Sequence, residues 1–158
     1  MALTMRIRYI LVSGVFACAG AIHPAWSADF PQPKTALREA ITLTLEEHET
    51  VLGKMRDLLA LSQLILDGAV NANMKQVAMA AREGGLHGGA HMPPSVQAKL
   101  PLPFRQLAQA THRTFDEIVQ EAEQTGNRDA ILRKLSENLQ RCVTCHANYT
   151  VRSAPRSQ

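Results

Sequence analysis

An apolar repeat with helical spacing lies in the region after residue 34, and it constrains the fold more than any other feature. Its members step alternately by four and three residues, as along one face of an amphipathic helix: Ile41, Leu45, His48, Leu52, Met55 and Leu59. Pro31 and Pro33 prevent an earlier start, and Gly68 is a suitable stop, so we expect a first helix over residues 34–67. Aromatic residues are only 4% of the chain, which favours helices over a β-sandwich.

A shorter second helix is expected over residues 72–83. Asn71 or Asn73 would cap its N-terminus, and the pair Gly84-Gly85 would end it. The long stretch that follows, residues 84–101, reads as irregular, with one helical turn after Pro94.

The third and fourth helices are expected on either side of Gly126. Pro103 stands at the start of the third, whose inward residues are Phe104, Leu107, Thr111, Phe115, Ile118 and Ala122. Asn127 would cap the fourth, whose inward residues are Ile131, Leu135, Leu139, Cys142, His146 and Tyr149. No segment alternates with period two for long enough to predict a strand. Short joints at 68–71 and 126–127 favour an all-α, antiparallel four-helix bundle.

The first 27 residues have the layout of a secretory signal peptide. Residues 1–8 carry two arginines and no acid, residues 9–22 are uncharged and mostly apolar, and small residues precede a cleavage site near Ser27. Cleavage at Ala21 and a lipoprotein-type signal over residues 15–18 are alternatives. A membrane span would need about 20 apolar residues. We therefore expect a periplasmic protein with a single domain over residues 28–158 and no stable membrane span after cleavage.

Removing the signal changes the charge balance. The whole chain has 17 basic and 14 acidic residues. Residues 1–27 hold two arginines and no acid, which leaves 15 basic against 14 acidic residues. A nearly neutral chain gives no reason to expect a nucleic acid as partner. Cys18 leaves with the signal, so Cys142 and Cys145 are the only cysteines of the mature chain.

These cysteines belong to the run Cys142-Val143-Thr144-Cys145-His146. A thioredoxin-type dithiol lies where a strand meets a helix, whereas this pair lies deep in a predicted helix. A structural zinc site needs four ligands, and the run supplies three. Covalent haem attachment needs two sulfurs about one turn apart and an adjacent imidazole, which this run provides. We therefore predict one haem c, bound through thioethers at Cys142 and Cys145, with His146 as proximal iron ligand.

With a signal peptide, four helices and this motif near the end of the last helix, the chain resembles cytochrome c′ and the other class II cytochromes c. The resemblance implies a four-helix bundle that encloses the haem. Members either leave the sixth iron position open beside an apolar residue or fill it with a methionine from the first helix. Open members bind small gases, and methionine-ligated members transfer electrons. Dimerisation through the first two helices is common among them, so a homodimer is one expected assembly.

The residue opposite His146 on the first helix decides between these two kinds. His146 lies 19 residues after Asn127, and counting 19 back from Gly68 reaches residue 49. The inward residues near that level are His48, Leu52 and Met55. Aligning the family's end-of-helix glycine with Gly68 places the distal position nearest Leu52, which implies an open site, and a slip of one turn brings Met55 there. Met55 is the preferred distal ligand and would give the His/Met ligation that suits electron transfer; an open site beside Leu52 and ligation by His48 are the alternatives. Arg56 would be either a haem propionate partner or a surface charge.

The sequence thus predicts an electron carrier that exchanges electrons with redox partner proteins and is not an enzyme. A gas-binding haem protein is the first alternative, and a thiol oxidoreductase that uses Cys142 and Cys145 is the second. A copper site built from His87, His91 and Met92 in the irregular loop is a weaker reading, since three ligands on a glycine-rich loop make a poor site.

Overall fold

The computed structural model describes residues 37–88 and 92–155 of the 158-residue chain. Its elements, in chain order, are β1 (Glu39–Leu43), α1 (Leu45–Val70), α2 (Met74–Gly84), α3 (Pro94–Lys99), α4 (Leu102–Gln124), α5 (Arg128–Asn148) and β2 (Tyr149–Ser153). The expectation of a mostly helical fold is confirmed. The predicted signal peptide lies outside the described residues. None of the helices in the described part combines the length and apolar character needed to cross a membrane.

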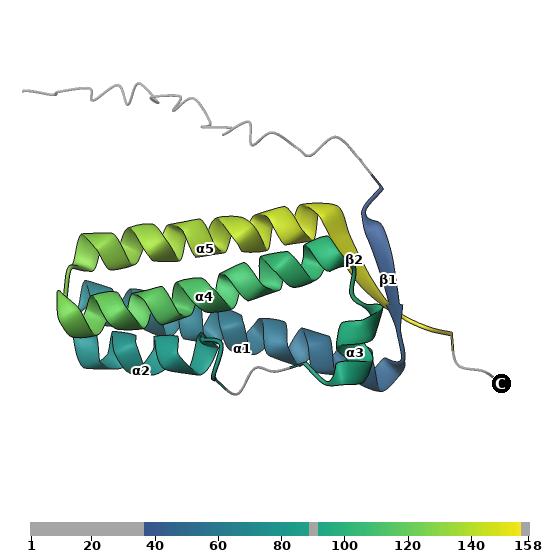
Figure 1. Ribbon diagram of the computed structural model, residues 1–158, viewed down its shortest axis with the longest axis horizontal. Coiled ribbons are helices and arrows are strands. Elements are labelled where there is room, and N and C mark those ends of the chain that lie inside the picture. The colour runs from purple at the N-terminus through teal and green to yellow at the C-terminus, as the bar shows by residue number, and fades with distance from the viewer. Residues whose placement is uncertain (1–36, 89–91, 156–158) are drawn as a thin grey trace, which may run out of the picture. The chain divides into compact units, whose positions relative to one another are not determined.

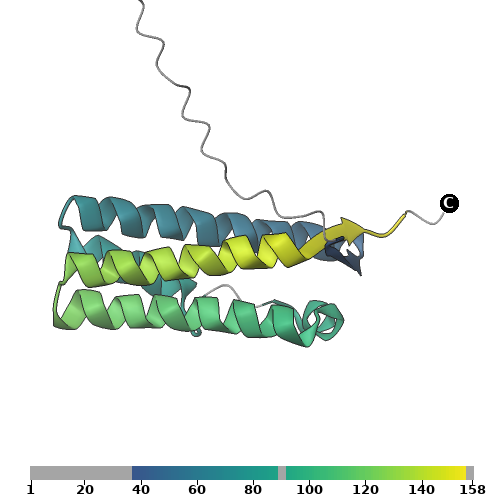
Figure 2. The same ribbon diagram turned by 90° about the horizontal axis from the view of Figure 1, so that it is seen from above.

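The four longer helices pack together in a ring (Figure 1). α1 packs on α2, α2 on α4, and α4 on α5, while the contact between α5 and α1 is the sparsest of the four. The chain reverses at the short joints between α1 and α2 and between α4 and α5, and Figure 2 shows α1, α5 and α4 lying along one another. At the second of these joints Gly126 has a φ of +60°, in the left-handed region that glycine adopts more readily than other residues.

The starts of α5, α2 and α4 agree with the sequence predictions. The Asn127 side chain caps α5 by accepting a hydrogen bond from the backbone N–H of Ala130 at 3.1 Å. The Asn73 side chain caps α2 in the same way, accepting from Gln76 N–H at 3.1 Å. Pro103 lies in the first turn of α4, where its missing N–H costs no hydrogen bond.

The expectation that the chain has no strands is wrong. β1 and β2 form a two-stranded parallel sheet in which Glu39 lies opposite Tyr149 and Leu43 opposite Ser153. β1 covers residues assigned from the sequence to the first helix. Within it, Ile41 and Leu43 are buried, and the exposed residues around them give an alternation only a few residues long. So short a pattern does not stand out against the helical repeat.

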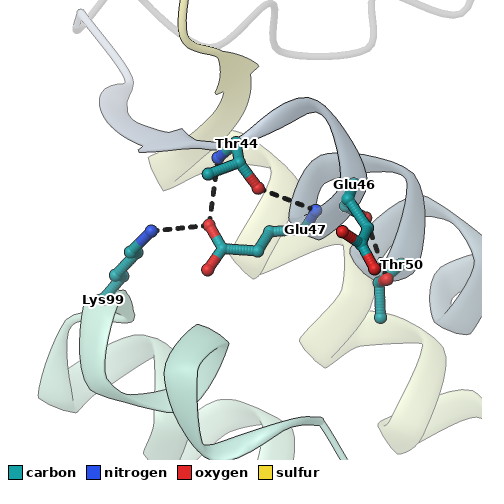
Figure 3. Close-up of polar contacts among 5 residues, drawn as sticks. All are labelled: Thr44, Glu46, Glu47, Thr50 and Lys99. Atoms are coloured by element: carbon teal, nitrogen blue, oxygen red, sulfur yellow. Dashed lines mark hydrogen bonds and ion pairs between the residues drawn. The ribbon is translucent and has the colours of Figure 1, made fainter.

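The first helix therefore starts at Leu45, fixed by a capping box (Figure 3). Thr44 Oγ1 accepts a hydrogen bond from Glu47 N–H at 3.2 Å, and a Glu47 carboxylate oxygen accepts one from Thr44 N–H at 3.0 Å. The same oxygen accepts from the Lys99 ammonium group at 2.6 Å, which ties the end of α3 to the start of α1. These hydrogen bonds lower the pKa of the Glu47 carboxyl; the bond from Lys99 is the largest cause, and the bond from the Thr44 N–H is the next.

The inward face predicted for the first helix has the right period but the wrong phase. Leu45 is exposed and Leu59 is 66% exposed, whereas the buried residues of α1 are Val51, Ser62, Ile65, Gly68 and Ala69. Ser62 can be buried because its hydroxyl donates to the Leu58 carbonyl at 2.8 Å. Serine, glycine and alanine contribute little to a hydropathy pattern. The exposed leucines therefore determined which face of the helix the sequence analysis took to be inward.

Two apolar clusters and a polar layer lie in the interior of the described part of the chain. The α2-side cluster contains Ile65, Ala69, Val77, Ala78, Ala80, Ala81, Phe115, Ile118, Ala122, Ile131 and Leu135. The sheet-side cluster contains Ile41, Leu43, Val51, Val96, Leu100 and Phe104. Between them along α4 and α5 lie the members of the polar layer, Thr111, Thr114, Asn138 and Arg141.

Candidate functional site

The Cys142–His146 run occupies the last two turns of α5, as the sequence predicted. α5 ends at Asn148, and the next residue, Tyr149, begins β2. The Tyr149 ring meets the Phe104 ring edge to face, with centroids 5.4 Å apart and planes at 75°. The strand pairing and this ring contact hold the C-terminal end of α5 against the start of α4 and against β1.

The inward face of α5 differs from the predicted one. Asn138 is buried and Cys145 is half-buried, whereas Leu139 and His146 are exposed. The inward stripe is therefore Ile131, Leu135, Asn138, Cys142, Cys145 and Tyr149, which again alternates steps of four and three. Both cysteines lie on this stripe and are half-buried, whereas His146, one residue after Cys145, is exposed.

Cys142 and Cys145 are free thiols, each half-buried. Burial raises the pKa of the Cys142 thiol, although its own backbone hydrogen bond and the Arg141 charge act in the opposite direction. Burial, and then the charge of Cys142, raise the pKa of the Cys145 thiol. The pair also lies at a helix C-terminus, whose partial negative charge disfavours a thiolate. These are the opposite of the conditions that activate a nucleophilic cysteine.

Met55 and Cys145 pack against the same sheet-side cluster, although they lie on different helices. Of the three distal candidates, Met55 is the one that shares this cluster with Cys145. Leu52 is half-buried. His48 is also half-buried; its Nδ1 is buried without a hydrogen-bond partner, and the Glu49 carboxylate lies 3.4 Å away. Arg56, the propionate candidate, is exposed.

The alternative copper site is only partly covered by the described residues. Met92 packs against the sheet-side cluster, and His87 is exposed. His91 lies outside the described residues. Within residues 37–88 and 92–155, no three side chains from His, Cys, Asp and Glu converge as a metal-binding group.

Sequence reasoning missed Met92 and Arg141 as neighbours of this region. Met92 was assigned to a loop, and its packing against the sheet-side cluster is a tertiary contact that no local pattern reveals. Arg141 directly precedes Cys142, and Asn138 lies four residues before Cys142 on the inward stripe. A polar residue in an otherwise apolar stripe is the signal that could have pointed to the polar layer.

No protein-family model, no curated protein and no solved structure matches this chain.

Proposed function

We propose that the protein is a monohaem c-type cytochrome that carries electrons, with the haem attached at Cys142 and Cys145. The observation that carries the proposal is the placement of two free, half-buried thiols, three residues apart on the inward stripe of α5, directly before the His146 imidazole. This donor set suits the group chemically. Cys142 and Cys145 would each hold the haem by adding their S–H across one of its vinyl groups, an addition in which no atom leaves and no oxidant is needed.

His146 is the proposed proximal ligand. It lies on the last turn of α5, and its side chain makes no hydrogen bond or ion pair to the rest of the described chain, so an imidazole nitrogen is available to iron. Met55 is the proposed distal ligand, supported by its packing against the cluster that Cys145 also contacts. When bound, the haem supplies one-electron chemistry, and the protein sets its potential through the ligands, burial and nearby charge.

The thiol oxidoreductase reading is less well supported. Such an enzyme needs a stabilised thiolate, and the raised pKa values of Cys142 and Cys145 together with the helix C-terminus disfavour one. The fold we propose for the functional protein is an antiparallel four-helix bundle enclosing the haem. In this proposal the signal peptide directs the protein to the periplasm, and its partners are redox proteins there.

Visible spectroscopy of protein produced with a haem-attachment system tests the proposal. We expect a low-spin ferrous spectrum with little carbon monoxide uptake. Met55→Ala should shift the spectrum towards high spin and lower the potential, because methionine ligation raises it. Leu52→Ala is the matched control one turn away, and its ligation should be unchanged.

Each other outcome selects an alternative. A high-spin wild-type spectrum with rapid carbon monoxide binding would favour a gas-binding site beside Leu52. Loss of the low-spin spectrum in His48→Ala, but not in Met55→Ala, would assign the distal position to His48. Colourless protein with two titratable thiols would favour the oxidoreductase.

A further inference from the structure

The polar layer next to the candidate site contains a cation without an anionic partner. Thr114 and Asn138 are almost completely buried, at 3% and 2% exposure. The Arg141 guanidinium reaches both: its Nη1 donates to Thr114 Oγ1 at 3.0 Å and lies 3.4 Å from Asn138 Oδ1. Buried hydroxyl and amide groups need such partners, so Arg141 is held in place by two neutral side chains.

The ion pairs of the described residues do not include Arg141. Arg82 pairs with Glu123, Lys99 with Glu47, and Lys134 with Glu117 at 3.2 Å. No carboxylate of the described chain comes within ion-pair distance of Arg141, and Glu137, one turn earlier on α5, is exposed. No carboxylate of the described chain therefore offsets the guanidinium charge, and solvent screens that charge less in this half-buried position than at the surface.

We propose that Arg141 is a fixed cation that raises the reduction potential of the haem, an inference that rests on the proposed function. Arg141 precedes Cys142 by one residue and His146 by five, about 7.5 Å along the helix axis. Reduction adds one electron to the iron, so a nearby positive charge stabilises the reduced form more than the oxidised form. Thr114 and Asn138 act as positioning residues, because they hold the guanidinium on the inner side of α5.

The midpoint potential of the haem-loaded protein is the readout. Arg141→Gln should lower the reduction equilibrium constant about threefold to tenfold, a tenfold change being about 59 mV for one electron. Arg141→Lys keeps the charge and should stay close to the wild type. Arg133→Gln is the matched control, because Arg133 is exposed, lies eight residues earlier on α5 and takes part in no ion pair. It should change the constant less than twofold.

If Arg141 had only a structural role, Arg141→Gln would change the free energy of unfolding. It would not change the midpoint potential of a haem whose ligand spectrum stays the same. The inference is overturned if Arg141→Gln leaves the potential unchanged or raises it, or if Arg133→Gln lowers it equally. Where the neutral variant at position 141 does not take up haem, Thr114→Val removes the shorter of the two hydrogen bonds that hold the guanidinium and leaves its charge intact. A lower potential supports the inference, and an unchanged one overturns it. A wild-type protein without haem would instead refute the proposed function.

Discussion

The two apolar clusters differ in size and in what borders them. The α2-side cluster is enclosed by four helices, and its edge is formed by leucine, valine and methionine side chains. The sheet-side cluster is closed by two short strands and by α3, and its partly buried edge includes Met55, Met92 and Cys145. The first packs the four helices together, while the second has Cys145, one of the two proposed attachment residues, at its edge. Stability and the proposed function are thereby assigned to different ends of the helices.

Phe115→Ala should have the largest effect on stability. The Phe115 ring is 1% exposed in the α2-side cluster, and truncating a buried phenylalanine costs about 3–5 kcal/mol. Urea unfolding of the haem-free protein measures it. Met55→Ala at the sheet-side cluster should cost less, because Met55 is only partly buried. Equal losses in the two variants would remove the distinction between the clusters.

Gly84→Ala tests how tightly the α2-side cluster is packed. A Cβ atom at Gly84 would lie 2.8 Å from the Phe115 ring, and overpacking of this kind costs about 1–3 kcal/mol. At Gly53, on α1, a Cβ would meet nothing within 4 Å, so Gly53→Ala should stabilise by about 0.5–1 kcal/mol. Thermal unfolding of both variants provides the comparison. Destabilisation by both would contradict the difference in packing.

Thr44→Ala removes the cap where the sheet-side cluster meets α1. Loss of the Thr44 hydroxyl leaves Glu47 N–H without its acceptor, and such caps are worth about 1 kcal/mol. Thr44→Ser keeps the hydroxyl and serves as the control. The expected order of midpoints in urea is wild type, then serine, then alanine. A serine variant as unstable as the alanine variant would mean that the methyl group, not the cap, matters.

The smallest expected effect is the pH dependence of the Glu47–Lys99 pair. The pKa of Glu47 is lowered in the folded state from its ordinary value of 4.5, so the pair stabilises the fold above that value. This contribution is lost as the pH falls through the lowered value. Lys99→Met should therefore reduce the free energy of unfolding at pH 7, with the difference from wild type shrinking in acid. Lys75→Met, at an exposed position on α2, should show no such trend. A difference that persists unchanged in acid would contradict the assignment.

The parts of the fold that depend on local chemistry could be predicted from the sequence. Asn127 and Asn73 cap helices because their side-chain oxygens reach a backbone N–H three residues on. Pro103 marks the start of α4 because proline fits the first turn of a helix. The helical position of the Cys142–His146 run follows from the same signals.

What depends on tertiary contacts could not be predicted. β1 is a strand because Tyr149 and the residues after it pair with it, and those residues are more than one hundred positions away in the chain. The inward face of α1 depends on Ser62, whose burial requires a hydrogen bond that a hydropathy pattern does not record. For the candidate site, the motif pointed to the two cysteines and the His146 imidazole as candidate residues. The position of the Arg141 guanidinium could not be predicted, because it depends on hydrogen bonds to Thr114 and Asn138.

The most direct test of the central claim is the intact mass of acid-denatured wild-type protein, produced in a host that attaches haem to exported proteins. The account predicts the mass of the processed chain plus one iron protoporphyrin, and loss of that added mass in the Cys142→Ala/Cys145→Ala double variant. A wild-type chain that carries no added mass, from a host whose own c-type cytochromes are loaded, would contradict it.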